Sequence, residues 1–185
     1  MTKEEVLAVL REDGDYVSGE QIADRLGVSR AAVWKQVQAL VREGYGIESH
    51  QHRGYRLVSV PDRLYAAEVR HGLQTRLVGR CVVHCDTTTS TNTVARQLAE
   101  DDAEEGTVVI AERQTRGKGR LGRLWVTEPG GAWLSVVLKP GIDPAHAASI
   151  TLLAAVSVTK AVRKAGVEAA IKWPNDVLVN GKKIC

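Results

Sequence analysis

The 185-residue sequence contains no phenylalanine, one methionine and only three cysteines. An odd and small number of cysteines does not provide the framework of a disulfide-stabilised secreted domain. Cys81 and Cys85 are four residues apart in a β-like segment, so we expect both thiols to face a core. A zinc site that combines them with His84 would lack a fourth ligand, and it is not favoured. The absence of phenylalanine excludes no class of function.

Long apolar runs are also absent. The longest mostly apolar stretch, residues 150–158, is too short to span a bilayer and contains Thr and Ser. The N-terminus lacks the apolar core of a signal peptide. A hydrophobic content of 44% and a net charge of +3 fit a chain with one sizeable core beside a small domain. We therefore expect a cytoplasmic protein that does not bind membranes.

Residues 1–60 have the pattern of a winged helix-turn-helix, a DNA-binding unit. The expected elements are three helices and then a β-hairpin wing: residues 4–11, 18–26, 29–43 and 46–57. Ser18 and Ser29 are predicted N-caps, and Gln21 completes a capping box with Ser18. A three-helix interaction module is the alternative interpretation of this segment.

The third of these helices has two different faces. Its predicted core residues are Val33, Val37, Leu40 and Val41. The predicted DNA-binding residues of its other face, its start and the wing are Ser29, Arg30, Ala31, Lys35, Gln38 and Arg53. Residues 25–60 carry six Lys or Arg and two Asp or Glu, a net charge of +4, whereas residues 1–24 carry two bases and seven acids. This asymmetry suits a surface that faces phosphates.

The segment of residues 113–123, R-Q-T-R-G-K-G-R-L-G-R, holds five cationic residues, three glycines and no acid. So many like charges repel one another unless an anion lies between them. Glycines let the backbone approach a ligand closely, with its N–H groups turned inward. The segment therefore predicts a loop that binds a polyphosphate or an acyl phosphate, although a solvated basic loop would have the same composition.

The spacing of the glycines distinguishes this loop from two other phosphate-binding motifs. Gly117, Gly119 and Gly122 match G-x-G-x-x-G, but a β-like run follows them where a dinucleotide-binding fold requires a helix. A Walker loop is excluded because no Gly-Lys-Ser/Thr ends the segment. We expect side-chain cations and backbone amides between two strands to bind the anion.

Two more polar segments lie at predicted element ends. In K-W-P-N-D, residues 172–176, the lysine at a strand end can place a fixed charge in a site, and the aspartate could hold a divalent cation on phosphates. A capped strand with a polar turn explains the same residues. The run D-T-T-T-S-T-N, residues 86–92, precedes a predicted helix, and its hydroxyls and amide suit both helix capping and contacts with a small polar heterocycle.

Three motifs follow the helix-turn-helix in a fixed order: S-T-N at 90–92, Q-x-x-G-K-G-R-x-G-R at 114–123 followed by Trp125, and K-W-P-N-D at 172–176. In this order and at this spacing they resemble the biotin protein ligases of the bifunctional type that also repress biotin operons. The resemblance implies an α+β fold: a winged helix-turn-helix, residues 1–60, and a mixed-sheet catalytic core of the class II synthetase type, residues 61–185.

The resemblance also implies roles for individual residues. Biotin would be contacted by Ser90, Thr91, Asn92, Gln114, Lys118, Gly119, Arg120 and Lys172. The loop over the adenylate would include Gly117, Gly122, Arg123 and Trp125. Lys118, Arg120 and Lys172 would act in catalysis, and Asp176 would be a ligand of Mg²⁺. Lys118 stands where many members have arginine, so a point charge replaces a bidentate fork.

The activity implied by the resemblance is ATP-dependent ligation of biotin, through biotinyl-5′-AMP, to a lysine of a biotin carboxyl carrier protein. Operator DNA would be the second partner, and a homodimer is a further expectation. A biotin-sensing DNA-binding regulator without catalysis remains the alternative function. A related lipoyl-transfer enzyme is less favoured, since such enzymes generally lack the winged helix and K-W-P-N-D.

The elements expected in the second domain alternate between helices and strands. Helices are predicted over 62–73, 91–100 and 144–165, and strands over 80–85, 107–111, 132–138 and 169–173. Residues 177–184 predict a hairpin around Asn180-Gly181 with a type I′ turn. Because the returning strand has barely begun at Cys185, we expect a core that is incomplete at its C-terminus.

Overall fold

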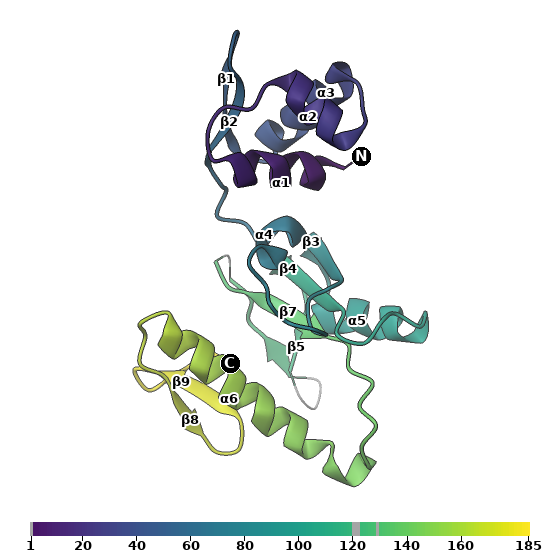
Figure 1. Cartoon of the computed structure of the whole chain (residues 1–185). Coiled ribbons are helices and arrows are strands. Elements are labelled where there is room, and N and C mark those ends of the chain that lie inside the picture. Colours follow the sequence, from purple (N-terminus) through teal and green to yellow (C-terminus); the bar gives the residue numbers. More distant parts are fainter. Residues whose placement is uncertain (1, 120–122, 129) are drawn as a thin grey trace. The chain divides into compact units, whose positions relative to one another are not determined.

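The computed structural model describes residues 2–119, 123–128 and 130–185. Contacts between residues divide the chain into two compact units, Met1–Leu138 and Lys139–Cys185. Among the described residues, the first unit contains five α-helices and seven strands, and the second contains a short 3-10 helix, one long α-helix and three short strands; Figure 1 labels most of these elements. The domain boundary predicted at residue 60 lies inside the first unit and remains a prediction.

The N-terminal part of the first unit is a winged helix-turn-helix. Its elements are α1 (Lys3–Asp13), α2 (Gly19–Leu26), α3 (Arg30–Arg42), β1 (Gly46–His50) and β2 (Gly54–Ser59). Each helix follows a side-chain cap: the hydroxyl oxygens of Thr2, Ser18 and Ser29 accept hydrogen bonds from backbone N–H groups three residues later. The predicted elements and both predicted caps are confirmed, with ends shifted by one or two residues.

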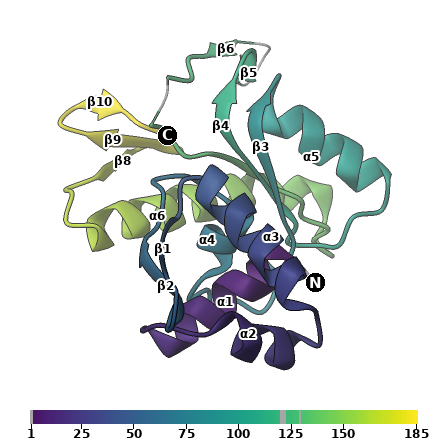
Figure 2. The same cartoon turned by 90° about the horizontal axis from the view of Figure 1, so that it is seen from above.

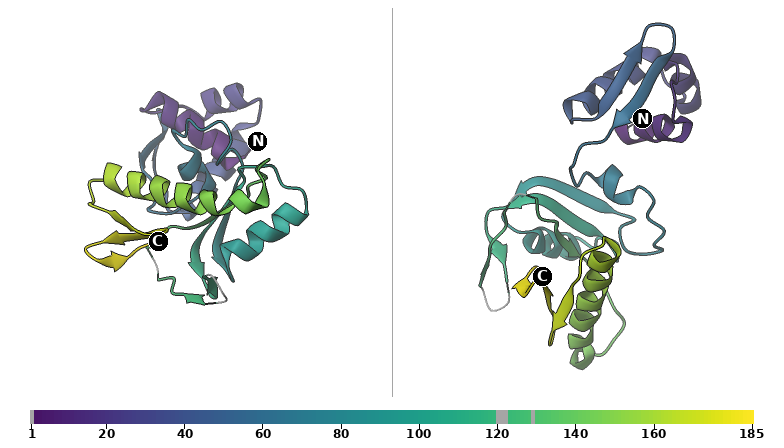
Figure 3. Two further views of the ribbon diagram at one scale, coloured as in Figure 1. Left: turned by 90° about the horizontal axis from the view of Figure 1, so that it is seen from below. Right: turned by 90° about the vertical axis from the view of Figure 1, so that its left-hand side faces the viewer.

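The helices and the hairpin enclose a core of their own. Its most deeply buried residues are Val6, Leu7, Leu10, Val17, Ile22, Val33, Val37 and Leu40. The hairpin lies beside the helices, and Tyr55 and Leu57 of β2 pack against this core (Figure 3, right). The prediction that Val41 is a core residue is wrong, since its side chain is 43% exposed. Val41 is rotated by about 100° from buried Leu40 around the helix axis, which turns it to the surface.

An extended linker, with only a short helix, follows the hairpin. The helix expected over 62–73 is limited to α4 (Ala66–Arg70). Tyr65 has extended backbone angles, φ −57° and ψ 146°, and the backbone N–H of Leu64 donates a 2.8 Å hydrogen bond to Glu112 Oε1. These tertiary contacts keep the linker out of the helical conformation, so the predicted helix is too long.

A mixed three-stranded sheet forms the rest of the first unit. Its strands, in the order β3–β4–β7, are β3 (Val82–Thr88), β4 (Val108–Gln114) and β7 (Trp133–Val136). β3 and β4 are parallel and are joined through α5 (Thr91–Glu100) (Figure 2), whereas β4 and β7, both labelled in Figure 1, are antiparallel. Ala95 of α5 packs on Val109 and Val137 of the sheet region. The mixed sheet of an α+β fold is as predicted.

Both parallel strands extend three residues beyond their predicted ends. Thr87 pairs with Arg113 and Thr88 with Gln114, so the first part of the threonine run is strand and not loop. Threonine favours strands, and the two extensions satisfy each other's backbone groups. The expectation of a core thiol at Cys81 is wrong, because this residue precedes β3 and is exposed, while Cys85 is half-buried.

Described residues of the cationic segment pair with residues just after it in two very short strands, called here the cationic hairpin. β5 (Gly117–Lys118) pairs antiparallel with β6 (Leu124–Trp125), and the Gly119 N–H donates a 2.8 Å hydrogen bond to the Arg123 carbonyl. The hairpin continues beyond the end of β4 (Figure 2). Its two strands, of two residues each, lie inside the loop that is expected between two longer strands.

The second unit packs one helix on a three-stranded antiparallel sheet (Figure 3, left). Its elements are η2 (Pro144–His146), α6 (Ala148–Lys164), β8 (Ala170–Lys172), β9 (Asp176–Val179) and β10 (Lys182–Lys183). The buried cluster consists of Ala155, Ala169 and Val177. Asn180 and Gly181 have φ of 49° and 74°, the positive values that a type I′ turn requires, so the predicted hairpin is confirmed.

The helical segment of residues 144–164 is long and mostly apolar. By length and composition alone it could cross a membrane, so the expectation that no segment is long enough is wrong. The helix extends past residues 150–158 in both directions with few charges. The core helix of a soluble protein meets the same criterion, and a single such helix does not by itself indicate a membrane protein.

Candidate functional site

The carboxyl ends of β3 and β4 meet the N-terminus of α5 at one edge of the sheet. In α/β proteins, ligands bind at the carboxyl ends of parallel strands. The residues predicted to contact biotin in this part of the chain lie here: Ser90, Thr91, Asn92 and Gln114. Ser90 and Thr91 are buried, with 1% and 4% of their surface exposed. Gln114 is half-buried and Asn92 is exposed, so this polar cluster is open to solvent on one side.

Gln114 caps α5 from a neighbouring strand. The backbone N–H of Thr91 donates a 2.7 Å hydrogen bond to Gln114 Oε1, and Thr91 Oγ1 lies 3.1 Å from the same oxygen. The N-cap residue Ser90 makes no side-chain cap hydrogen bond. Because a backbone N–H can only donate, the amide oxygen of Gln114 must face α5. Its amide nitrogen is turned away and carries two N–H donors suitable for a polar ligand.

Ser135 of β7 completes the cluster, and sequence reasoning missed it. Its Oγ lies 2.9 Å from Thr91 Oγ1 and 3.1 Å from Asn92 Oδ1. Ser135 pairs with Val109 in the ladder between β7 and β4. The only signal in the sequence is a single hydroxyl in the apolar run of residues 133–138, and it does not reveal a partner more than forty residues away.

The cationic hairpin starts at the same edge of the sheet. The Thr115 N–H donates a 2.9 Å hydrogen bond to the Thr88 carbonyl, which extends the ladder between the parallel strands. On the returning side, the Thr127 hydroxyl donates to the Gln114 carbonyl at 2.8 Å. Both sides of the hairpin are therefore anchored beside the polar cluster.

Within the hairpin, Lys118 and Arg123 are exposed and Trp125 is half-buried. A Cβ atom on Gly117 would lie 2.6 Å from the carbonyl oxygen of Trp125, so the pairing of the two strands requires glycine at this position. Among the residues that the structure describes, no carboxylate forms an ion pair with Lys118 or Arg123, and both charges are available to an anion. The predicted site residues Arg120 and Gly122 lie outside the described residues.

Lys172 and Asp176 belong to the second unit. Lys172 is exposed at the end of β8, and it pairs in the ladder with Asp176 at the start of β9. The Asp176 carboxylate accepts a 2.5 Å hydrogen bond from Lys183 Nζ. In residues 2–119, 123–128 and 130–185 no three His, Cys, Asp or Glu side chains gather as metal ligands. The role of Asp176 as a ligand of Mg²⁺ stays a prediction.

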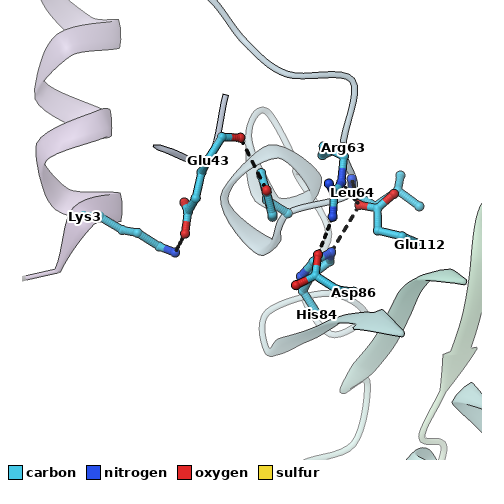
Figure 4. A network of polar contacts seen from close by, with 8 residues as sticks. Lys3, Glu43, Arg63, Leu64, His84, Asp86 and Glu112 are labelled. Atoms are coloured by element: carbon cyan, nitrogen blue, oxygen red, sulfur yellow. Dashed lines mark hydrogen bonds and ion pairs between the residues drawn. The ribbon is translucent and has the colours of Figure 1, made fainter. Parts of the chain in front are cut away.

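Glu112, two residues before Gln114 on β4, anchors the linker to the sheet (Figure 4). Its Oε1 accepts the hydrogen bond from the Leu64 N–H and lies 3.0 Å from Arg63 Nε and 3.2 Å from His84 Nε2. Burial alone raises the pKa of Glu112, but the Leu64 hydrogen bond and the contacts with Arg63 and His84 outweigh it. The pKa of this carboxyl is therefore below its ordinary value.

Other contacts join the winged helix to α4. The Glu68 carboxylate accepts hydrogen bonds from Arg11 Nη2, at 2.6 Å, and from the Tyr45 hydroxyl, at 2.7 Å. Burial, together with this hydrogen bond, raises the pKa of Tyr45 well above its ordinary value. Figure 4 also shows the ion pair between Lys3 and Glu43 at this side of the linker. The linker thus contacts both the helices and the sheet that carries the polar cluster.

The exposed face of α3 is a second candidate site, for DNA. Three of the residues predicted to bind DNA have exposed side chains on this face: Arg30, Ala31 and Lys35. Gln38 is half-buried. The Ser29 hydroxyl accepts a hydrogen bond from the Ala32 N–H, so it serves as the helix cap. Trp34 was not among the predicted residues although it is 58% exposed on this face. Its position three residues after Ala31 is the signal that could have identified it.

The wing arginine predicted to bind DNA is held by contacts within the domain. Arg53 Nη2 lies 3.3 Å from Asp15 Oδ1, and its guanidinium lies 4.1 Å from the centroid of the Tyr16 ring. The Tyr16 hydroxyl in turn donates a 2.7 Å hydrogen bond to Glu48. These contacts orient Arg53 on the wing, and its contact with DNA remains a prediction.

Family profiles match both parts of the chain. The profile of the biotin/lipoate A/B protein ligase family matches residues 84–185, more than half of the chain, and that of an HTH domain matches residues 2–56. The chain belongs to the biotin/lipoate A/B protein ligase family. This membership accounts for the occurrence of S-T-N, the cationic segment and K-W-P-N-D in one chain.

Several relatives in this family combine both parts. The bifunctional ligase/repressor BirA of Bacillus subtilis is 44% identical over 171 residues, which cover 91% of this chain and 53% of that protein. BirA of Escherichia coli is 32% identical over 181 residues, covering 96% and 54%. The chain thus spans about half the length of these relatives. Among solved structures, the biotin protein ligase from Aquifex aeolicus in complex with biotin and ATP matches with a TM-score of 0.50 and 32% identity, over 56% of this chain and 44% of that one.

Proposed function

We propose that this chain acts in ATP-dependent ligation of biotin to a biotin carboxyl carrier protein and in biotin-responsive repression of transcription. The observation that carries the proposal is the clustering of the S-T-N segment with Gln114 beside an anchored cationic hairpin. The family, the ligase and repressor names of the relatives, and the ligands of the Aquifex aeolicus structure support it.

The polar cluster would bind the ring system of biotin. Gln114 offers two N–H donors, and Asn92 offers a carboxamide at the exposed side of the cluster. A urea needs both donors and acceptors, and a cluster of amide and hydroxyl side chains provides them without a charge. Ser90 and Thr91 would form the buried wall of this site.

The hairpin would bind the anionic groups that react, which are the carboxylate of biotin and the phosphates of ATP. In the first step a carboxylate oxygen of biotin bonds to the α-phosphorus of ATP, and the bond from that phosphorus to the pyrophosphate oxygen breaks. Two anions must approach each other, so cations lower the barrier by offsetting their repulsion. Lys118 and Arg123, together with Arg120 and Lys172, are proposed for this role. The product is biotinyl-5′-AMP with release of pyrophosphate.

In the second step a neutral lysine amine of the carrier protein attacks the acyl carbon of the adenylate. A new amide bond forms, AMP leaves, and the amine gives up a proton. The mixed anhydride is prone to hydrolysis, so residues that cover it protect it from water, and the glycine-containing hairpin is proposed as this cover. ATP reacts as a magnesium complex, and no step is assigned to the metal.

The winged helix would bind operator DNA through the exposed face of α3, and the repressing species is proposed to be a homodimer. ATP and operator DNA are both inside the cell, so the proposal places the protein in the cytoplasm, free of the membrane. Lys35→Ala is expected to lower the slope of log K against log salt by about one, as for the loss of one phosphate contact. An unchanged slope would remove Lys35 from the phosphate-contacting residues.

The ligase part is tested by exchange of labelled pyrophosphate into ATP, with the protein expressed from its complete reading frame. Exchange that depends on biotin and Mg²⁺ is expected, because adenylate formation is reversible. If no exchange occurs and operator binding still responds to biotin, the protein is a biotin-sensing regulator and not a ligase.

A further inference from the structure

Ser135 has one hydroxyl proton and two acceptors within hydrogen-bond distance. Its Oγ lies 2.9 Å from Thr91 Oγ1 and 3.1 Å from Asn92 Oδ1. A serine hydroxyl donates one hydrogen bond at a time, whereas it can accept two. The hydroxyl and amide groups of this cluster can therefore share their protons in two different ways.

In the first arrangement, Ser135 donates to Asn92 Oδ1 and accepts the proton of the Thr91 hydroxyl. In the second, Ser135 donates to Thr91 Oγ1, whose own proton then points to Gln114 Oε1 at 3.1 Å. The Thr91 backbone N–H holds Gln114 Oε1 at 2.7 Å in both arrangements. The first is the one that holds the Asn92 carboxamide in place, and the second lone pair of Asn92 Oδ1 stays open to a donor from outside the protein.

We propose that Ser135 is a positioning residue that holds the Asn92 carboxamide so that Asn92 Oδ1 accepts a ring N–H of the ligand. The inference rests on the proposed biotin site, since the ring system of biotin contains a urea with two N–H donors. Before binding, Ser135 satisfies Asn92 Oδ1. A ligand N–H then takes the second acceptor position of this oxygen, and the hydrogen bond from Ser135 stays in place. No hydrogen bond of the cluster has to break when the ligand binds.

The backbone and the hydroxyl of Ser135 have different roles. Its backbone pairs with Val109 in the antiparallel ladder, and this pairing does not involve the hydroxyl. The hydroxyl contacts the first two residues of α5, the element that carries the S-T-N segment. Replacing the hydroxyl by hydrogen therefore removes the hydrogen bond that holds Asn92 and leaves the ladder in place.

The test compares Ser135→Ala and Ser135→Thr with the wild type by calorimetric titration of the protein from its complete reading frame. The ligands are biotin and its two cyclic carbamate analogues, in which oxygen replaces one ring N–H, with weak ligands measured by competition against biotin. Ser135→Ala is expected to bind biotin about tenfold more weakly, as for one hydrogen bond, and Ser135→Thr to restore most of the affinity. For one carbamate analogue, the wild type and Ser135→Ala are expected to bind equally.

Equal weakening for all three ligands would show that Ser135 only supports the fold, and unchanged biotin affinity would show that it has no role; either result overturns the inference. If Ser135→Ala does not fold, Asn92→Ala, at an exposed position, must give the same ligand-selective loss. A wild-type protein that binds no biotin would reject the proposed function itself. Biotin binding that is insensitive to Ser135 would reject only the inference.

Discussion

The helix N-termini of the winged helix and the N-terminus of α5 are capped in different ways. α1, α2 and α3 are each capped by the hydroxyl that directly precedes them, with partners three residues apart. In α5, the cap residue Ser90 makes no such bond, and Gln114, 23 residues away from Thr91, satisfies the first N–H. The hydroxyl of a local cap is already used in a hydrogen bond to its own helix. The cap supplied by another strand leaves amide and hydroxyl groups together at an open edge, where a ligand can use them.

The core of the winged helix and the core between α5 and the sheet also differ, in the number of buried residues. Eleven buried hydrophobic residues form the core of the winged helix, whereas the cluster between α5 and the sheet has three, namely Ala95, Val109 and Val137. The winged helix therefore carries its own stability, while α5 depends more on polar contacts with β4 and β7. A ligand that binds these polar contacts would stabilise α5 in particular.

The largest expected effect tests the self-contained core. Leu40→Ala should lower the free energy of unfolding of the winged helix by about 2–5 kcal/mol, because Leu40 is 1% exposed and leaves a cavity. Val41→Ala, at the next position, is the matched control and should cost less than about 1 kcal/mol, since its side chain is largely outside the core. Amide hydrogen exchange of residues 3–59 measures both. Equal losses of stability in the two variants would contradict the assignment of Leu40 to the core and of Val41 to the surface.

A smaller effect is expected at the cap supplied from another strand. Gln114→Ala should weaken biotin binding by about 10–100-fold, corresponding to about 1–3 kcal/mol, because it removes the ligand-facing donors and leaves the Thr91 N–H without its partner. Gln97→Ala, on the exposed side of α5, is the control and should bind biotin like the wild type. Titration calorimetry measures both variants. The proposed site would be wrong if the two variants bound biotin equally well.

Two serine substitutions compare a helix that has a local side-chain cap, α2, with one that lacks it, α5. Ser18→Ala should reduce the stability of the winged helix by about 1 kcal/mol, because it removes the hydrogen bond to the Gln21 N–H. Ser90→Ala removes no side-chain cap bond, so α5 should lose less stability than α2. Thermal unfolding followed by hydrogen exchange of each helix provides the measurement. A loss at Ser90 as large as that at Ser18 would end the distinction between the two kinds of cap.

The smallest effect concerns the pH dependence of the linker contact. The pKa of Glu112 is lower in the folded chain than its ordinary value of 4.5. The unfolded chain therefore binds more protons near this pH, so the contribution of Glu112 is complete above about pH 4.5 and is lost as pH falls through the lower folded value. Stability measured between pH 3 and 6 should rise less steeply with pH in Glu112→Gln than in the control Glu100→Gln. Identical curves would contradict a role for the Glu112 carboxylate.

The sequence predicted features that depend on neighbouring residues. The caps Ser18 and Ser29, the wing hairpin and the turn at Asn180 follow from local rules, and all are present. The order of the three motifs was sufficient to suggest the family. These features were predictable because the interacting groups are only a few residues apart in the chain.

Features that depend on distant partners were missed or misplaced. Helix α4 is short because the linker residues before it contact Glu112. Strands β3 and β4 are long because the backbone groups of each form hydrogen bonds with those of the other. Ser135 joins the candidate site through contacts with residues more than forty positions away. None of these pairings leaves a periodic signal in the sequence, because the choice of partner is made by the tertiary fold.

The most direct test of the account follows backbone amide resonances of the protein from its complete reading frame during titration with biotin. We expect the amide signals of Thr91 and its neighbours at the start of α5 to shift saturably with biotin, while those of the locally capped Ser18–Gln21 segment do not move. Saturable shifts that spare Thr91, or no shifts at all, would contradict a biotin site at this edge of the sheet.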